Sequence, residues 1–326
     1  MMQAIRFHRH GGPEVLQLEQ VPVPEPGPGE LLVRVEGAGV NYADTVRRWG
    51  DHYPIPTPLP AIAGGELAGV VERVGAGVDS SWIGQRVLGT PPLAAYAQFA
   101  LLPEALAWRL PDGLSAQQGL ALLVQGLSAA FILRRAGQLQ PSERVLVEGA
   151  AGGVGSLGVQ LARLYGASQV LGAASSEKKR ARVLELGADA AIDYTQPGWS
   201  DEVMRLTSGH GVDIIMEMTG GEVFAEAFKC LAPGGRIVVY GIASRKPYQV
   251  PSERLIARGQ AVVGFYLGRF LKDRALVEST LAHFAGLISK GQLRLDAISV
   301  MPLAEAAEAH RQLESRQSTA KFVLVP

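Results

Sequence analysis

Residues 148–163 read EGAAGGVGSLGVQLAR, and this stretch decides the fold that the sequence predicts. It follows the apolar run RVLVE and leads into an amphipathic segment, so its glycines and alanines lie at a strand-to-helix junction. Glycine costs conformational entropy there, which indicates that another group approaches the backbone closely. A dinucleotide-binding turn needs small residues for this reason, because its pyrophosphate must reach backbone N–H groups.

The spacing inside the turn is Ala150-x-Gly152-x-x-Gly155, with alanine in place of the first glycine of the usual fingerprint. The N-terminus of the following helix offers partial positive charge and free N–H donors to a phosphate. The alternative is close packing of the helix on the strand with no ligand. The residues expected to contact the cofactor here are Ala151, Gly152, Gly153, Val154 and Gly155.

The end of the second strand indicates which dinucleotide is bound. A site for NAD generally has an acidic residue about 20 positions beyond the glycines, where it binds the ribose hydroxyls. This chain has LGAASSEKKRAR at 171–182, without an acid at the strand end. Ser175, Ser176 and Lys179 suit a 2′-phosphate instead, and Lys178 and Arg180 lie beside them. NADPH is therefore the predicted cofactor, and a solvated helix face is the alternative for the cations.

Composition limits the partners and the compartment. Among 326 residues, Lys and Arg number 31 and Asp and Glu number 31, which indicates no nucleic-acid or membrane partner. Cys230 is the one cysteine, so an internal disulfide is impossible and a reducing compartment fits. The start of the chain lacks the apolar core of a signal peptide, and the apolar segment 119–133 is short for a membrane span. We expect a buried helix there and a cytoplasmic protein.

The pattern of the chain changes near residue 140. Before about residue 110, short β-branched runs alternate with connections rich in proline and glycine, which favours a β-rich domain. From about residue 140, apolar strands alternate with amphipathic helices, which predicts a parallel sheet covered on both faces. The predicted class is α/β, with a second, β-rich domain.

Residues 142–163, SERVLVEGAAGGVGSLGVQLAR, resemble the signature of the quinone oxidoreductase and ζ-crystallin branch of the medium-chain dehydrogenase/reductase superfamily. Residues 12–50 and 310–326 are similar to the family's opening and closing segments. The resemblance implies a GroES-like β-rich catalytic domain at 1–122 and 266–326, and a doubly wound Rossmann-type NADPH-binding domain at 123–265. It also implies a homodimer.

The resemblance raises the question of metal, because the superfamily contains zinc-dependent and zinc-independent enzymes. Where zinc-dependent members have a catalytic cysteine and a histidine, this chain has Asn41 and Gly65. A lone histidine is more often a surface or capping residue than a ligand, so no metal is expected. The six histidines, which show no paired ligand spacing, are His8, His10, His52, His210, His283 and His310.

Without a metal, hydrogen bonds must polarise the oxygen of the acceptor while the nicotinamide supplies hydride. The resemblance directs attention to residues 39–54, GVNYADTVRRWGDHYP. Asn41 can donate from its amide and Tyr53 from its phenol, whereas Asp44 is expected to orient its neighbours. The alternatives are a turn cap for Asn41, a core position for Tyr42 and a loop wedge for Tyr53. Two weaker candidates, Gln125 and Ser128, lie in the apolar segment.

The remaining cofactor contacts are expected beyond the strand ends, where ligands of open parallel sheets bind. Phe265 is placed to cover the nicotinamide, and a core position is its alternative. The full set is Tyr194, Thr219, Gly220, Gly241, Ile242 and Phe265.

The predicted activity is NADPH-dependent reduction of a quinone or a related α,β-unsaturated carbonyl, without metal. Reduction of an enoyl thioester or a 2-alkenal is the alternative within the same enzyme class. From another class, the alternative is a non-catalytic NADPH-binding protein with a sensor or crystallin-like role.

Overall fold

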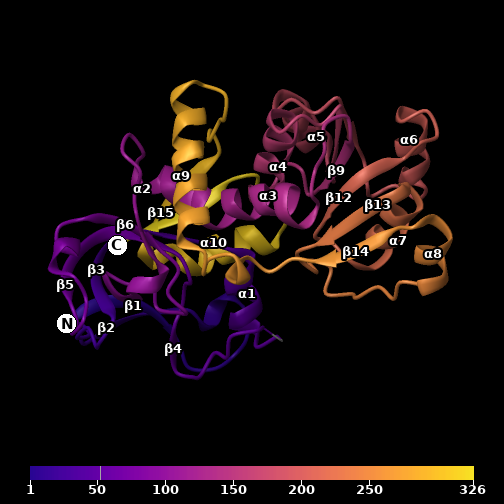
Figure 1. Cartoon of the computed structure of the whole chain (residues 1–326). Helices are drawn as coiled ribbons and strands as arrows, with labels where there is room; N and C mark the ends of the chain where they lie inside the picture. Colours follow the sequence, from indigo (N-terminus) through magenta and orange to yellow (C-terminus); the bar gives the residue numbers. More distant parts are fainter. Residues whose placement is uncertain (52) are drawn as a thin grey trace. The chain divides into compact units, whose positions relative to one another are not determined.

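The computed structural model describes residues 1–51 and 53–326 and divides into two compact units (Figure 1). Met1–Val124 and Phe270–Pro326 form one unit, called here the β-rich unit. Gln125–Arg269 form the other, called here the parallel-sheet unit. Along the sequence, the parallel-sheet unit is thus inserted between the two segments of the β-rich unit.

The β-rich unit has two sheets, of which the larger runs β15-β16-β3-β5-β6-β8, with β7 paired to β3. The pairs that β3 makes are antiparallel. The smaller sheet is β2-β1-β4. The strands are β1 (Met2–Phe7), β2 (Gln17–Val21), β3 (Glu30–Gly39), β4 (Ala61–Ile62), β5 (Leu67–Val74), β6 (Arg86–Gly89), β7 (Phe99–Pro103), β8 (Ala107–Arg109), β15 (Ile298–Pro302) and β16 (Lys321–Val325).

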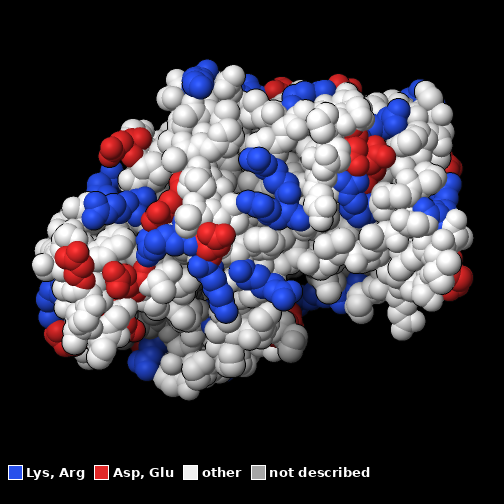
Figure 2. All heavy atoms as spheres, viewed as in Figure 1, with Lys and Arg blue, Asp and Glu red and all other residues white. Residues whose placement is uncertain are grey.

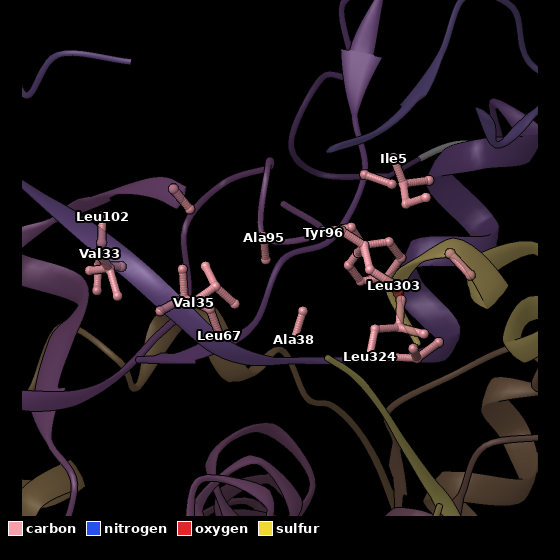
Figure 3. Close-up of a cluster of buried hydrophobic side chains, with 14 of the residues drawn as sticks. Ile5, Val33, Val35, Ala38, Leu67, Ala95, Tyr96, Leu102, Leu303 and Leu324 are labelled. Carbon is pink, nitrogen blue, oxygen red and sulfur yellow. The ribbon is translucent and has the colours of Figure 1, made fainter. Parts of the chain in front are cut away.

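The core of the β-rich unit packs side chains from strands that are distant in sequence. Figure 3 shows Ile5, Tyr96, Leu303 and Leu324 in one buried cluster, which brings both ends of the chain together. Val33 of β3 lies beside Leu102 of β7 in the same cluster. The helices of this unit are α1 (Tyr42–Trp49), α2 (Ala116–Ala121), α9 (Arg274–Ser289) and α10 (Ala306–Glu314), with 3-10 turns at Pro13–Val15, Ser80–Trp82, Glu104–Leu106 and Leu303–Glu305.

The parallel-sheet unit has six strands in the order β11-β10-β9-β12-β13-β14, and all five pairings are parallel. This is the doubly wound order, with the reversal beside the first strand of the unit. The strands are β9 (Arg144–Glu148), β10 (Gln169–Ala173), β11 (Ala190–Ile192), β12 (Val212–Glu217), β13 (Leu231–Val239) and β14 (Ala261–Gly264). The helices are α3 (Leu127–Phe131), α4 (Gly153–Leu164), α5 (Glu177–Glu185), α6 (Trp199–Leu206), α7 (Gly221–Lys229) and α8 (Ser252–Arg258), with a 3-10 turn at Leu267–Arg269.

Ligands of doubly wound sheets bind beyond the carboxyl ends of the strands, at the point where the strand order reverses. Here that point lies between β9 and β12, so the turn that joins β9 to α4 is the expected place. The strands are buried apolar runs, as a sheet covered on both faces requires. The sequence motif at 148–163 therefore lies where the topology places a ligand.

The apolar segment that the sequence singled out is helical from Ala116 to Ala136, which is longer than the expected 119–133. Two turns, Leu122–Gly126 and Ile132–Ala136, are π-helical. The segment is long and apolar enough to cross a membrane, but 78% of its most apolar window is buried inside the structure. Such burial is typical of a core helix. Figure 2 shows charged side chains of both signs interspersed on the face in view, in keeping with the balanced composition.

Candidate active site

The turn after β9 has glycines at positions where a side chain would collide with the backbone or adopt an unfavourable conformation. A Cβ on Gly155 would lie 2.2 Å from the carbonyl oxygen of Gly149, which is backbone and has little room to move. Gly149 itself has φ +56°, a left-handed conformation that favours glycine. At Gly152, the N-cap residue of α4, the only atom of the described residues near a Cβ position is the Gly149 oxygen at 3.2 Å. The backbone at Gly152 therefore has space for a ligand, whereas the backbone at Gly155 packs tightly against Gly149.

This turn fits a diphosphate. The first turn of α4 leaves N–H groups without acceptors inside the helix, and the helix dipole adds partial positive charge there. The Ala150 N–H donates to the carbonyl of Ala173 (3.1 Å), which ties the turn to the end of β10. Gln125 lies against the turn, because a Cβ on Gly153 would come 2.3 Å from its amide.

The end of β10 carries the residues expected to select the cofactor. Ser176 caps α5 by accepting from the Lys179 N–H (3.4 Å), so Ser176 and Lys179 are held together. Lys179 is half-buried, and burial lowers the pKa of its ammonium, whereas Lys178 is exposed. Arg180 contacts Asp193 at 2.9 Å, so the carboxylate that follows β11 is already paired. Of the cations expected at this site, Lys179 is half-buried in the first turn of α5, and Arg180 forms an ion pair.

The other expected cofactor residues all follow the carboxyl ends of parallel strands. Thr219 and Gly220 follow β12 and are buried, and both N–H groups donate to the Glu217 carboxylate. Ile242 follows β13 and is 50% exposed, which leaves an apolar side chain facing outward at the ligand-binding edge. The remaining residues, Ala151, Val154, Ser175, Tyr194, Gly241 and Phe265, lie at the same edge and are buried or half-buried.

Two buried carboxyl groups lie beside this edge, and the sequence reasoning missed both. Val147 and Met216 are partners on β9 and β12, so Glu148 and Glu217 are the next pair along the two strands. Both residues are fully buried. Neither Glu148 oxygen has a hydrogen-bond partner among the described residues. Burial, and then the charge of Glu217, raise the pKa of Glu148 to about 8, so it holds a proton at neutral pH.

This raised pKa predicts that alkali destabilises the fold. Between the usual glutamate pKa and about 8, folded Glu148 retains a proton that the unfolded chain has released, so the free energy of unfolding falls as pH rises through that window. Glu148→Gln, which is uncharged at every pH, should remove this contribution. We expect thermal melting to give similar Tm values near the acid end of the window, and a variant Tm at least about 2 °C above wild type at its alkaline end. A wild-type advantage at alkaline pH would contradict the assignment.

In the β-rich unit, three strand ends bring polar side chains together. Asn41 follows β3, Glu66 precedes β5, and Lys321 begins β16. β3 pairs with both other strands, and the Gly39 N–H donates to the Glu66 carbonyl at 3.0 Å. A Cβ on Gly39 would lie 2.0 Å from Glu66 Oε2 and 2.9 Å from Lys321 Nζ. Glycine at this position therefore leaves room for a buried ion pair beside Asn41.

The contacts of Asn41 fix the direction of its amide. Lys321 Nζ donates to Asn41 Oδ1 (2.9 Å), and Asn41 Nδ2 donates to Glu66 Oε2 (2.9 Å). Because an ammonium can only donate and a carboxylate can only accept, the reversed amide would lose both hydrogen bonds. The second Nδ2 hydrogen has no acceptor in the part of the chain that the structure describes, and Asn41 is half-buried. One oriented N–H is therefore available to a ligand.

Asp44 is held behind Asn41 by a chain of buried groups. Its Oδ2 accepts from the Asn41 N–H (2.8 Å) and from the Tyr96 hydroxyl (3.1 Å). Tyr96 also contacts His310 Nε2 at 3.2 Å, and Arg48 donates to His310 Nδ1 at 3.0 Å. Burial raises the pKa of Asp44 to about 6. Asp44 thus positions the start of α1, in which Asn41 is the N-cap residue.

His310 differs from the surface or capping role that a lone histidine usually has. It is fully buried, and burial, with the nearby Arg48 charge, lowers its pKa to about 3, so the ring is neutral. Because Arg48 donates to Nδ1, the proton of the neutral ring is on Nε2 and faces Tyr96. Local sequence pattern does not indicate this contact, because Arg48 and His310 are 262 positions apart.

Tyr42 is the first residue of α1, and Tyr53 follows the end of the same helix. Tyr42 begins α1 and is half-buried, and its carbonyl accepts from the Thr45 hydroxyl at 2.8 Å. Tyr53 is also half-buried, and its ring stacks over the Arg47 guanidinium with 5.2 Å to the ring centroid. Arg47 donates to Thr57 Oγ1 (2.9 Å) and to the carbonyl of Pro92, so it anchors the loop that carries Tyr53.

Within residues 1–51 and 53–326, no group of three or more His, Cys, Asp or Glu side chains is arranged to hold a metal ion. At the positions where zinc-dependent relatives have ligands, Asn41 binds Lys321 and Glu66, and Gly65 lies beside Asp44. His52 lies outside the described residues.

Comparison with known proteins identifies both units. The "Alcohol dehydrogenase GroES-like domain" family matches residues 27–112, and the "Zinc-binding dehydrogenase" family matches residues 153–284. The predicted fold class, a GroES-like domain with a Rossmann-type domain, is confirmed.

The similarity extends over whole chains. A quinone oxidoreductase of Pseudomonas aeruginosa is 35% identical, over 100% of both chains. A 2-haloacrylate reductase of a Burkholderia species is 32% identical, over 100% of this chain and 99% of the relative. The crystal structure of Escherichia coli quinone oxidoreductase complexed with NADPH matches with a TM-score of 0.93 and 30% identity, over 99% of this chain and 100% of that one.

Proposed function

The chain belongs to the quinone oxidoreductase branch of the medium-chain dehydrogenase/reductase superfamily, and on that premise we propose that it reduces quinones or related α,β-unsaturated carbonyls with NADPH. The observation that carries the choice of acceptor is the Asn41 amide, which has a fixed direction and one N–H left for a ligand. A carbonyl oxygen that gains negative charge during reduction is the kind of group that such a donor stabilises.

The chain's residues have distinct tasks in this proposal. The turn at 151–155 holds the diphosphate with its N–H groups, and Ser175, Ser176 and Lys179 hold the 2′-phosphate. Thr219, Gly241, Ile242, Tyr194 and Phe265 line the rest of the cofactor site, with Gln125 beside the glycine turn. NADPH, when bound, supplies a hydride from its nicotinamide.

The acceptor side consists of the Asn41 and Tyr53 donors. Asn41 donates to the acceptor oxygen while it gains charge, and Asp44 and Tyr42 maintain the start of α1 that presents Asn41. The hydride brings two electrons and one proton to the acceptor, and the second proton comes from water or from the Tyr53 hydroxyl. The products are NADP⁺ and a hydroquinone or a saturated carbonyl compound.

Tyr53→Phe tests the second donor. Phenylalanine keeps the ring over Arg47 and removes only the hydroxyl, so the loop should stay in place. We expect kcat/KM to fall about tenfold, the value of one neutral hydrogen bond, with an unchanged Kd for NADPH. Stopped-flow turnover and a fluorescence titration measure the two quantities. Unchanged turnover with every acceptor would show that Tyr53 only packs within its loop and does not donate to the acceptor.

The substrate class is tested by steady-state oxidation of NADPH with a panel of quinones, 2-alkenals and enoyl thioesters. The proposal expects the highest kcat/KM for quinones or simple enones. A preference for enoyl thioesters or 2-alkenals would establish the alternative within the same class. No turnover with any acceptor, despite tight binding of NADPH, would favour a non-catalytic sensor or crystallin-like role. The proposal includes a homodimer in the cytoplasm, which sedimentation and cell fractionation would test.

A further inference from the structure

The ion pair between Lys321 and Glu66 is almost completely buried, although the fold does not need a buried ion pair for its stability. The side chains are 2% and 0% exposed, and Lys321 Nζ lies 2.6 Å from Glu66 Oε2. Removing two charges from water is costly, and a well-packed apolar pair commonly stabilises a fold as well as a buried ion pair does. The charges at this place therefore call for a role other than stability.

Their contacts indicate that role. Glu66 Oε2 accepts from both Lys321 and Asn41, and Lys321 donates to the other end of the same Asn41 amide. The three groups thus form a closed triangle, and charges of opposite sign hold the two ends of the amide. Glu66 Oε1 accepts from the Val124 N–H (2.9 Å), inside the π-helical turn, which fixes the carboxylate from its other side.

We propose that Lys321 and Glu66 are positioning residues that set the direction of the Asn41 amide, so that its remaining N–H is presented to the acceptor oxygen. This inference rests on the proposed function, because it assigns the ion pair to the donor used there. Neither residue touches the acceptor in this account. The ammonium withdraws electron density from Oδ1, which also makes the Nδ2 hydrogens better donors.

The test uses the double variant Glu66→Gln/Lys321→Met, because Lys321→Met alone would leave a buried carboxylate without its counter-ion. The double variant is neutral and of similar volume, so we expect its Tm to stay near that of wild type. The substituted glutamine and methionine side chains cannot enforce one direction of the Asn41 amide. We expect kcat/KM to fall at least about tenfold with an unchanged Kd for NADPH.

A double-mutant cycle separates positioning from general damage. In an Asn41→Ala background, the double substitution should change kcat/KM by less than about twofold, because there is no amide left to orient. The control is Arg236→Met/Glu143→Gln, a half-buried pair at the opposite, N-terminal edge of the parallel strands. That control should leave kcat/KM unchanged even if it lowers Tm.

A binding measurement supplies a readout other than turnover. 4-Nitrophenolate has a charged oxygen like that of a reduced quinone, and its Kd for the NADP⁺-loaded protein should rise about tenfold in the double variant. Equal loss of kcat/KM in the wild-type and Asn41→Ala backgrounds would overturn the inference, as would full activity of a folded double variant. If Asn41→Ala itself has no effect on kcat/KM, Asn41 is not the donor in the proposed function. That result differs from one in which Asn41→Ala lowers kcat/KM but the double variant does not, which would reject only the positioning role of Lys321 and Glu66.

Discussion

Asn41→Ala should lower kcat/KM for quinone or enone reduction by about 10²–10³-fold, the usual effect of losing one preorganised donor to a developing oxyanion. The loss should fall equally on kcat and kcat/KM, because the donor acts mainly on the transition state. Lys321 Nζ lies 2.6 Å from Glu66 Oε2 in the wild-type protein, so removal of the amide leaves each charge with its counter-ion. Steady-state kinetics with one quinone and one enone would measure the effect.

Thr45→Val is the matched control for Asn41→Ala. Thr45 is buried on the same helix, and its hydroxyl donates to the Tyr42 carbonyl (2.8 Å), so the variant loses one local hydrogen bond near the site. Its kcat/KM should stay within about twofold of wild type. Full activity of Asn41→Ala, or an equal loss in Thr45→Val, would contradict the assignment of Asn41 as the donor.

Lys179→Ala should weaken NADPH binding by roughly ten- to more than a hundredfold and leave the Kd for NADH nearly unchanged. Lys179 is half-buried in the first turn of α5, which Ser176 caps just beyond the end of β10, and a charge-assisted contact with a phosphate contributes about 1.5–3 kcal/mol. Only NADPH carries the 2′-phosphate, so only its binding should respond. Fluorescence titration of both cofactors gives the four dissociation constants.

Lys178→Ala provides the control on the same helix. Its side chain is exposed, and it points about 100° away from Lys179, so NADPH binding should change much less. Added salt should weaken NADPH binding to wild type more than to Lys179→Ala, since screening acts on the charge pair. Equal losses for both cofactors in Lys179→Ala would show a role in the fold or at the diphosphate. Equal wild-type affinities for NADH and NADPH would remove the basis of the NADP assignment.

The sequence predicted the parallel-sheet unit well because its signals are local. Its first strand is a short apolar run followed by an amphipathic helix, and the glycine turn between them identifies the first crossover. The strand at 144–148 and the helix at 153–164 lie where the motif predicted them. The confirmed family and fold class follow from the same stretch, since its small residues are required by close backbone contacts.

In the β-rich unit, the contacts that form the site join residues far apart in the sequence, and a local sequence pattern cannot predict such contacts. Helix α1 has only eight residues, and contacts from distant parts of the chain stabilise it: Tyr96 donates to Asp44, and His310 accepts from Arg48. Lys321 and Glu66 are 255 positions apart, and each looks like an ordinary surface charge in the sequence. One signal was available for Lys321: it is the charged first residue of a terminal strand that is otherwise apolar. Glu148 likewise ends an apolar strand, which was a sign of a buried carboxyl group.

The central claim is that hydride passes from NADPH to an acceptor whose oxygen is stabilised by protein hydrogen bonds rather than by zinc. The most direct measurement uses protein dialysed against a chelator, NADPH deuterated at nicotinamide C4 on one face and then the other, and a simple enone. Mass spectrometry and NMR of the product then locate the label. We expect full turnover after chelation, with deuterium from one of the two cofactors on the β-carbon of the saturated ketone. An unlabelled product with both cofactors, or turnover that returns only when zinc is added, would contradict it.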